Sequence, residues 1–565
     1  MRFASALLLI LPLAAACGDD GGHTPDTGGA PTGAIAATVT HYDYTLDLDS
    51  LAAHATITAT VTTAGDCFAL PFRGAALAAK SVTIDGVAAV SAHVADKTLT
   101  ACGAGSTVGT TLTLDADLTV AKATLAPSQV GFSTEKDAQQ NTYYYLVSWV
   151  GGCDQFAPCD SRPDQFATYT FHVTHSAGLV VRCPGTIAEP SPTVTTCDFA
   201  FPGGPTYSTF GLIASNAWTQ TDKGMFGSVH VTVYDRASTG IAAKLDPAFH
   251  DGYIKFMEST FGPYPYGSDL RVLTAPTYWN GFEHPGNIVL ADTLAKQKEG
   301  YTDSLAHTLD HEMTHMWAGD QTTIAGLYDF AWKESMAEYL PFTYESAQSI
   351  ASGEATAAVW KRDAAQAVYS PVPDDAPALI DYYSDVYGAG PLILFRQIEV
   401  MYSRAKVIAA LKTLLGAQRA VSVDEVVAAL STATGEDLTA YAHAWLHGTG
   451  TPDWPRFQLT FTPAAGSGAT SSLVVHQTNQ DKGVRGCAFH VAIFGANAGE
   501  SSEVLVDTFH HGPDQTIDVP TPAFTVVGTS VDPHNECLVF APLATPAPHP
   551  RLWIAPARVP SRRAL

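Results

Sequence analysis

The hydrophobic pattern of the chain changes period twice, and this change constrains the fold more than any other feature. From about 37 to 216, apolar and β-branched residues alternate in stretches such as THYDYTLDLD and ATYTFHVTH, which is typical of strands with one buried face. From 217 to 450 apolar residues recur at spacings of three and four, as in SLAHTLDHEMTHMWAG, which is typical of helices. Alternation returns over 451–545. The sequence therefore predicts a multidomain α+β protein with an N-terminal antiparallel β-domain, a mainly helical domain and a C-terminal β-sandwich.

Length and charge agree with this division and exclude one class of partner. The 565 residues are enough for about three or four domains. Acidic residues outnumber basic ones by 55 to 30, which gives a formal net charge of -25. Such a chain is not expected to bind nucleic acid.

The N-terminus has the features of an export signal. Arg2 precedes an apolar run, and 1–16 is interpreted as a signal peptide that is too short to span a bilayer. The string LAAAC resembles a bacterial lipobox, so we expect cleavage before Cys17, lipid modification of that cysteine, and a flexible tether over 17–36. The chain would then be a lipoprotein of the bacterial cell envelope that contacts the membrane through its lipid anchor only; ordinary secretion is the alternative. A Pro- and Arg-rich tail is expected over 546–565.

Eight further cysteines suit disulfides, because an exported chain meets an oxidising compartment. The sequence does not define their connectivity, although pairing of neighbours would give four local bridges. A cysteine metal site is not supported by the spacings. The candidates are Cys67, Cys102, Cys153, Cys159, Cys183, Cys197, Cys487 and Cys537.

The segment His311-Glu312-Met313-Thr314-His315 carries the chemistry that is easiest to interpret. Asp303 and Ser304 are possible N-caps of a helix that contains it, and a helix places residues four apart on one face. Both imidazoles could then bind one zinc ion, with Glu312 beside the open coordination position. The alternative is a pair of surface histidines on an ordinary helix.

A second short helix, DFAWKESMAEYLPF, offers a third ligand. Glu334 and Glu338 share one of its faces, and Pro341 is expected to end it. Catalytic zinc usually takes three protein ligands and one water. His315 and Glu334 are separated by 18 residues.

With this spacing the chain resembles the aminopeptidase N family of zinc metallopeptidases. HEMTHMWAGD is similar to the family block HExxHxWxG(N/D), and WKESMAEY is similar to WxxEGxAEY, with Ser335 in place of the usual glycine. The resemblance covers most of the chain from Thr40 to Pro455. The large C-terminal helical domain of the longer members has no counterpart, so we expect a more open cleft.

The resemblance implies a thermolysin-like, mainly helical catalytic domain with a small sheet and a single zinc ion (Zn2+). Its ligands would be His311, His315 and Glu334. Glu312 would act as the base that activates water, and Glu338 would support a ligand rather than bind the metal.

Two further segments resemble family blocks that contact the substrate. YWNGFEHPGNIVLAD is similar to the GxMEN segment, an edge strand of the cleft, so Gly281 and Glu283 are assigned to substrate binding. Glu283 would hold the free α-amino group, while Asn280, Phe282 and His284 depart from the family pattern. DYYSDVYGAGPLILFRQIE contains Tyr387, which would donate a hydrogen bond to the oxyanion. Tyr382 and Tyr383 compete for that assignment.

The remaining histidines have simpler interpretations. His307 shares a helical face with His311 and is expected to support a ligand or to face solvent. His510 and His511 are expected to be surface residues.

The expected function is therefore zinc-dependent hydrolysis of the N-terminal bond of peptides with a free N-terminus. One alternative is a zinc endopeptidase or another zinc hydrolase on the same fold. Another is a catalytically inactive, lipid-anchored binding protein. The oligomeric state is unknown from the sequence.

Overall fold

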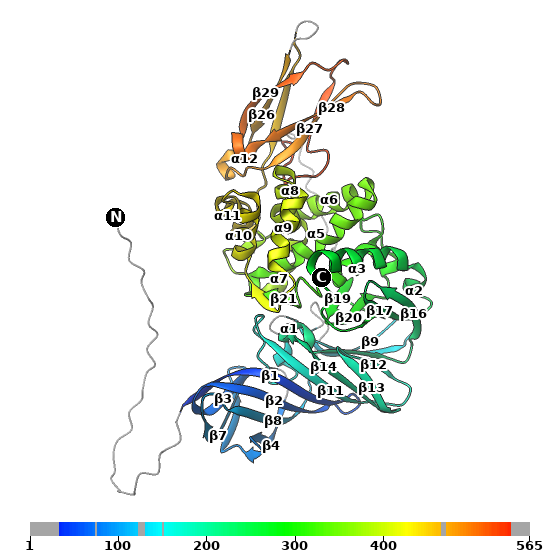
Figure 1. The fold of residues 1–565 in the computed structure, drawn as a ribbon, viewed down its shortest axis with the longest axis vertical. Helices are drawn as coiled ribbons and strands as arrows, with labels where there is room; N and C mark the ends of the chain where they lie inside the picture. Colours follow the sequence, from blue (N-terminus) through cyan, green and yellow to red (C-terminus); the bar gives the residue numbers. More distant parts are fainter. Residues whose placement is uncertain (1–32, 74–75, 123–129, 150–151, 465–469, 544–565) are drawn as a thin grey trace, which may run out of the picture.

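The computed structural model describes residues 33–73, 76–122, 130–149, 152–464 and 470–543. The expected signal peptide, Cys17, most of the tether and the C-terminal tail lie outside this part of the chain. The described residues form three layers along the long axis of the molecule (Figure 1): a β-domain at one end, a mainly helical region in the middle, and a smaller β-sandwich at the other end. No helix in the described part is long and apolar enough to span a membrane.

The N-terminal β-domain contains two sheets. The larger has eleven strands, with the order β13-β14-β11-β1-β2-β8-β4-β5 and with β3, β6 and β7 beside it; the smaller has the order β12-β15-β10-β9. A short helix, α1 (Thr206–Thr209), and a 3-10 turn, η1 (Cys153–Gln155), accompany them. The strands are β1 (Ala34–Asp47), β2 (Ala52–Thr63), β3 (Gly65–Pro71), β4 (Ala76–Ile84), β5 (Val87–Ala88), β6 (Ser91–Ala95), β7 (Thr98–Ser106), β8 (Thr111–Thr119), β9 (Gly131–Lys136), β10 (Thr142–Val147), β11 (Phe166–Thr174), β12 (Val180–Arg182), β13 (Thr186–Ser191), β14 (Val194–Pro205) and β15 (Gly211–Ser215).

The prediction of a purely antiparallel domain is wrong for β1. This strand pairs antiparallel with β2, but it runs parallel to β11, with His41 opposite Thr168, and parallel to β3, with Ala34 opposite Cys67. Alternation in the sequence indicates that one face of a strand is buried, but it carries no information on the direction of the neighbouring strand.

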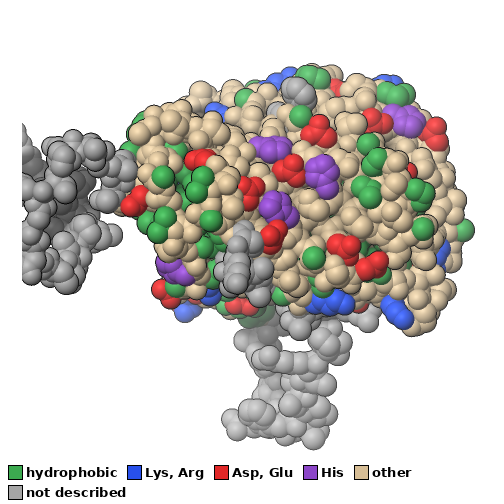
Figure 2. All heavy atoms as spheres, turned by 90° about the horizontal axis from the view of Figure 1, so that it is seen from below, with side chains coloured by type: hydrophobic (Ala, Val, Ile, Leu, Met, Phe, Trp, Pro, Cys, Tyr) green, Lys and Arg blue, Asp and Glu red, His purple; other side chains and the backbone are tan. Residues whose placement is uncertain are grey.

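Figure 2 shows the end of the molecule that the β-domain forms, where acidic and histidine side chains lie over the middle of the face.

The middle region combines a five-stranded sheet with most of the helices. The sheet order is β16-β17-β18-β20-β19, and β19 is an edge strand that pairs antiparallel with β20. Its strands are β16 (Thr219–Phe226), β17 (Val229–Asp235), β18 (Asp269–Ala275), β19 (Gly281–His284) and β20 (Asn287–Ala291). Two short pairs join β21 (Thr322–Ile324) to β23 (Arg419–Val421) and β22 (Val372–Pro373) to β24 (His447–Gly448).

This region contains most of the helices of the described chain, including the two that carry His311 and Glu334. Its helices are α2 (Ile241–Lys244), α3 (Pro247–Phe261), α4 (Ser304–Thr314), α5 (Phe330–Gln348), α6 (Ile350–Ala364), α7 (Leu379–Pro391), α8 (Gln397–Met401), α9 (Arg404–Leu414), α10 (Val423–Thr434) and α11 (Thr439–Leu446), with 3-10 turns at Leu294–Lys296 and Leu327–Asp329 and a π-helical turn at Leu392–Arg396. Helix α4 begins after Asp303, whose Oδ1 accepts hydrogen bonds from the backbone N–H groups of Leu305 and Ala306 at 3.0 and 3.2 Å.

Pro341 does not end the second predicted helix. Helix α5 continues through it to Gln348, although proline cannot donate the usual backbone hydrogen bond. Nearly every residue from Phe330 to Glu345 is buried, because α5 packs against α4, α6 and α7. Burial of the whole helix outweighs the local cost of the proline.

The C-terminal layer is a sandwich of two three-stranded antiparallel sheets, β25-β26-β29 and β28-β27-β30. Its elements are β25 (Phe457–Thr462), β26 (Thr470–Gln477), β27 (Ala488–Phe494), β28 (Ser501–Asp507), α12 (Thr508–His511), β29 (Asp514–Pro520) and β30 (Gly528–Val531), with a 3-10 turn at Gln480–Lys482.

Four disulfides connect neighbouring cysteines along the chain. They join Cys67 to Cys102, Cys153 to Cys159, Cys183 to Cys197, and Cys487 to Cys537. All eight predicted cysteines are therefore engaged, and none of them is free to bind a metal.

Candidate metal centre

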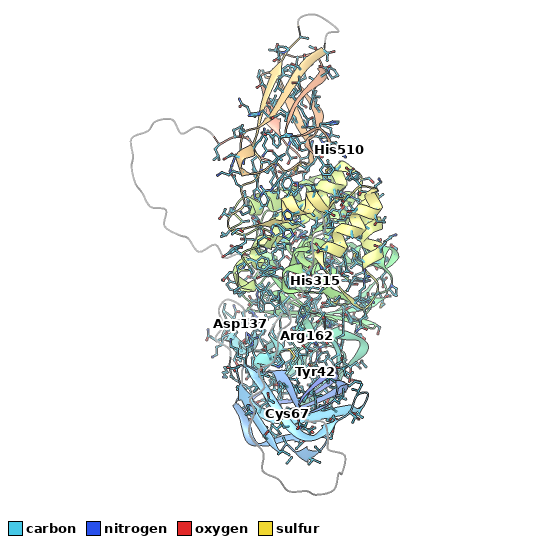
Figure 3. The ribbon with its side chains drawn as sticks, turned by 90° about the vertical axis from the view of Figure 1, so that its left-hand side faces the viewer. Tyr42, Cys67, Asp137, Arg162, His315 and His510 are labelled. Carbon is cyan, nitrogen blue, oxygen red and sulfur yellow. A yellow bond between two sulfur atoms is a disulfide. The ribbon has the colours of Figure 1, made fainter. Side chains whose placement is uncertain are left out.

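Two helices bring three nitrogen and oxygen atoms to one point. Helix α4 carries His311, His315 follows at its C-terminal end, and α5 carries Glu334. The Nε2 atoms of the two histidines lie 3.2 Å apart, and Glu334 Oε2 lies 3.3 Å from His311 Nε2 and 3.4 Å from His315 Nε2. All three residues are buried, with exposed fractions of 5% or less. Figure 3 shows His315 inside the middle layer of the molecule.

These distances fit a zinc ion. Tetrahedral zinc with bonds of about 2.0–2.2 Å holds its ligand atoms about 3.3–3.6 Å apart, close to the observed triangle. His315 Nδ1 donates to the backbone oxygen of Ala318 at 3.0 Å, which leaves the Nε2 lone pair for the metal. Glu334 Oε2 is buried and has no hydrogen-bond donor among the described residues. The predicted ligand atoms thus converge on one point, and Lys333 Nζ lies 3.5 Å from His315 Nε2.

Behind the candidate ligands, acidic and basic side chains alternate in a chain of contacts that begins at His311. Its Nδ1 lies 3.1 Å from Glu338 Oε1. Glu338 Oε2 accepts hydrogen bonds from Trp360 Nε1 at 2.6 Å and from His307 Nε2 at 3.1 Å, and Nδ1 of His307 lies 2.8 Å from Glu345 Oε1. Burial opposes the charged form of His307, but Glu345 and Glu338 hold its pKa well above the usual value. The sequence predicted that His307 either supports a ligand or faces solvent. In the structure it is buried between the carboxylates of Glu338 and Glu345.

Lys333 is a part of the site that the sequence analysis missed. Its Nζ lies 2.8 Å from Glu283 Oε1 and 2.8 Å from Glu334 Oε1, and the residue is 1% exposed. Burial alone would lower the pKa of Lys333, but the two carboxylates hold it well above the usual value. Because the lysine engages Oε1 of Glu334, Oε2 is left for the metal. The sequence did offer a signal, because Lys333 stands next to Glu334 within a mostly apolar helix. A lysine buried there needs an acidic partner.

The edge strand β19 runs beside the ligands and carries two predicted substrate-binding residues. Glu283 and Glu312 each offer a carboxylate oxygen within a group that also includes a ring nitrogen of His315, all within 4.8 Å of one another. A Cβ on Gly281 would lie 2.1 Å from Glu312 Oε1, so only glycine allows this approach. Burial raises the pKa of Glu312 to about 8; the charge of His311 opposes this rise, and the charge of Glu283 adds to it.

The tyrosines of α7 differ in position. Tyr387 lies over the metal centre, with its ring centroid 5.7 Å from that of His311, and its hydroxyl donates to Tyr383 at 2.6 Å. Tyr382 turns away and donates to the backbone oxygen of Leu327 at 3.3 Å. Tyr387 and Tyr383 therefore face the site, and Tyr382 does not.

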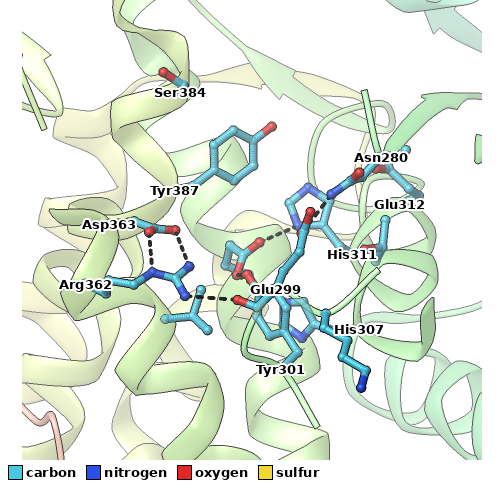
Figure 4. A pocket seen from close by; sticks show the side chains of 15 residues that line it. Asn280, Glu299, Tyr301, His307, His311, Glu312, Arg362, Asp363, Ser384 and Tyr387 are labelled. Atoms are coloured by element: carbon cyan, nitrogen blue, oxygen red, sulfur yellow. Dashed lines mark hydrogen bonds and ion pairs between the residues drawn. The ribbon is translucent and has the colours of Figure 1, made fainter. Parts of the chain in front are cut away.

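A cavity of about 290 Å³ opens on one side of these residues. Figure 4 shows His311, Glu312 and Tyr387 around it, with Asn280 near Glu312 and the Arg362–Asp363 ion pair on its far wall. By contrast, His510 lies in α12 at the level of the sandwich (Figure 3), paired with Asp507 and Glu436. It is remote from the three ligands, as expected for a surface residue.

Comparisons with known proteins agree with this geometry. Residues 249–445 match the model described as "Peptidase family M1 domain", and this range contains the three predicted ligands together with Glu283, Glu312 and Tyr387. No curated protein sequence matches the chain.

Two solved structures illustrate the shared fold. Aminopeptidase A from Legionella pneumophila, solved with aspartic acid, superposes with a TM-score of 0.69 at 15% identity, over 90% of this chain. The match spans 60% of the Legionella protein's length. An M1 zinc metallopeptidase mutant from Deinococcus radiodurans, bound to a Tyr-Ser-Ala substrate, superposes with a TM-score of 0.60 at 20% identity, over 74% of this chain and 96% of its own.

Proposed function

We propose that this protein is an aminopeptidase, because residues 249–445 are a zinc metallopeptidase domain of peptidase family M1. The family match and the related zinc metallopeptidase structure confirm the predicted family and its zinc cofactor. The residue roles and the reaction are our proposal. The observation that carries it is the position of Glu283. This buried carboxylate lies beside Glu312 and the zinc ligands, where it can pair with the α-ammonium group of a substrate. Such a pair fixes the first residue, so that only the first peptide bond reaches the metal.

The residues around the zinc ligands have separate roles in the proposed hydrolysis. Zinc, held by His311, His315 and Glu334, would polarise the scissile carbonyl and acidify a water. The Glu312 carboxylate accepts the proton of the attacking water and then gives it to the nitrogen of the leaving amine. The Tyr387 hydroxyl donates a hydrogen bond to the carbonyl oxygen as negative charge develops there.

The alternatives have less support. An inactive binding protein has no need of a complete ligand set with a carboxylate base beside it. An endopeptidase must accept chain on both sides of the scissile bond, and it gains nothing from a buried carboxylate at the position of Glu283.

The base and the ammonium site can be tested separately. Glu312→Gln should keep stoichiometric zinc, measured by metal analysis, and lose at least about a thousandfold in kcat for an alanine amide of a fluorescent amine. Glu283→Gln should also keep zinc, but its kcat/KM should fall by about a hundredfold or more, mainly through KM. Near-normal turnover of Glu312→Gln would refute the role of the base. Near-normal KM of Glu283→Gln would refute the aminopeptidase assignment.

The site of action is proposed to lie outside the cytoplasm, in the cell envelope or beyond it. Four disulfides support this, because such bonds persist in oxidising compartments. Peptides with free N-termini would be the substrates. The mature mass of protein recovered from membranes tests the lipid anchor on Cys17, since acyl chains add a defined mass that a simply secreted form lacks.

A further inference from the structure

Two cavities meet at the candidate metal centre. Both are lined by Gly281, His311, Glu312 and Tyr387. Glu283 lines only one of them. Given the proposed aminopeptidase function, on which this inference rests, the side chain of the first residue enters the cavity with Glu283. The rest of the peptide leaves through the other cavity.

The two cavities differ greatly in size. The one with Glu283 has a volume of about 20 Å³, whereas the other has about 290 Å³. A single water needs about 10–15 Å³ by this kind of measure. The smaller cavity therefore has room for a group of about the size of a methyl, while the leaving side can hold whole residues.

Aromatic side chains line the small cavity and pack against other aromatic rings. The ring centroid of Trp149 lies 4.7 Å from that of Tyr383 in an edge-on contact and 5.5 Å from that of Phe330. Trp279 and Phe282 lie 5.1 Å apart and are only 6% and 7% exposed. Enlarging the cavity would require several of these rings to move together, which is costly in a close-packed interior.

The cavity also disfavours charged first residues. Among the described residues that line it, none is Lys or Arg, so an acidic side chain would find no cationic partner. The carboxylate of Glu283 is already paired with buried Lys333 at 2.8 Å. The long side chains of lysine and arginine exceed a cavity of about 20 Å³.

From this geometry we propose that the enzyme selects peptides whose first residue is small and uncharged, such as alanine, glycine or serine. The residues that set this selectivity are Trp149, Trp279, Phe282 and Tyr383. The second residue is not restricted in the same way, because the larger cavity receives it.

The test is a panel of aminoacyl amides of one fluorescent amine, measured on the zinc-loaded full chain. We expect kcat/KM for the alanine amide to exceed that for leucine, phenylalanine, arginine and aspartate amides by at least about tenfold. Metal-dependent hydrolysis that is equal or faster with any of these four would overturn the selectivity but leave the aminopeptidase proposal intact. Absence of hydrolysis with every amide would overturn both.

A variant separates the cavity from other causes of selectivity. Trp149→Ala should raise the ratio of kcat/KM for leucine to that for alanine by about tenfold or more, because it removes one wall. Trp218→Ala is a matched control: this half-buried tryptophan contacts Tyr143 and Tyr234 and does not line the cavity, so the ratio should not change. If Trp149→Ala does not fold, Ile380→Ala tests another lining position. An unchanged ratio in the folded wall variant would contradict the proposal.

Discussion

Around the zinc ligands, single buried charges are compensated one by one. Glu338 lies between the imidazoles of His311 and His307, and His307 lies between Glu338 and Glu345. The opposite charges keep the pKa of Glu338 below its usual value in spite of burial. We therefore expect His307 to position His311 through Glu338.

Replacement of His307 should weaken the binding of zinc. In His307→Gln the cation beside Glu338 is lost, so the carboxylate no longer orients His311 as firmly, and we expect zinc affinity to fall by about tenfold. Competition with a chromogenic chelator measures this directly. His175→Gln, which changes a buried histidine of the β-domain bonded to Thr195, is the control. Equal zinc affinity in His307→Gln and the wild type would show that His307 has no such role.

His284 provides a pH-dependent contribution to stability. Burial lowers the pKa of its imidazole to about 4 from a usual value near 6.5, in spite of a hydrogen bond to the backbone oxygen of Ser208. The unfolded chain binds the proton more readily, so this contribution is complete above pH 6.5 and is lost as the pH falls toward 4, by about 3 kcal/mol.

Urea unfolding from pH 7 to pH 4 can isolate this effect. The difference in unfolding free energy between the wild type and His284→Gln should shrink by about 3 kcal/mol over that range, since glutamine does not titrate. A difference that stays constant with pH would show that His284 is not buried in its neutral form.

The clustering of His311, His315 and Glu334 was predictable from sequence because it depends on local spacing. His311 and His315 are one helical turn apart, and Glu334 follows at a separation that a second helix can satisfy. Lys333 and His307 were not predictable in their roles. Their partners, Glu283 and Glu345, come from distant segments, and only the tertiary fold brings them together.

At the scale of elements, α4 depends on its first residue. Asp303 caps the helix through the backbone N–H groups of Leu305 and Ala306 and also pairs with Lys244 at 3.0 Å. Asp303→Ala should lower the unfolding free energy by about 1 kcal/mol, measured by thermal or urea unfolding. Asp303→Ser keeps a capping oxygen and should lose much less. Equal losses in the two variants would assign the effect to the Lys244 pair rather than to the cap.

Element types followed from periodicity more reliably than their ends and directions. Asp303, one of the two predicted caps, begins α4 as expected. Pro341 misled the prediction of α5 because a proline signals a local preference, whereas this helix is stabilised by burial on most of its surface. The parallel pairing of β1 with β11 joins residues 127 positions apart, such as His41 and Thr168, which no local pattern encodes.

At the scale of the whole molecule, the disulfide between Cys487 and Cys537 stabilises the C-terminal β-sandwich. Cys487 and Cys537 are 50 residues apart in the chain, and the next residue, Leu538, donates its backbone N–H to Gln397 of α8 at 2.9 Å. The bridge therefore ties the sandwich close to its contact with the helical region.

Loss of this bridge should act on the sandwich and spare the metal centre. The double variant Cys487→Ser, Cys537→Ser should destabilise the sandwich by about 2–5 kcal/mol. In limited proteolysis, cleavage within the sandwich, C-terminal to residue 451, should then begin at a lower urea concentration than in the wild type, while zinc stays bound. The pair Cys67→Ser, Cys102→Ser, in the β-domain, is the control. Release of zinc at the same urea concentration as the first cleavage would contradict independent layers.

The most direct test of the account compares one tetrapeptide, beginning with alanine, in its free and N-acetylated forms. With zinc-loaded protein, mass spectrometry should show that the free peptide loses its alanine, and that a chelator stops this reaction. The acetylated peptide should be cleaved at least about a hundredfold more slowly, because it has no ammonium group for Glu283. Cleavage of the acetylated peptide at an internal bond, at a comparable rate, would contradict the assignment as an aminopeptidase.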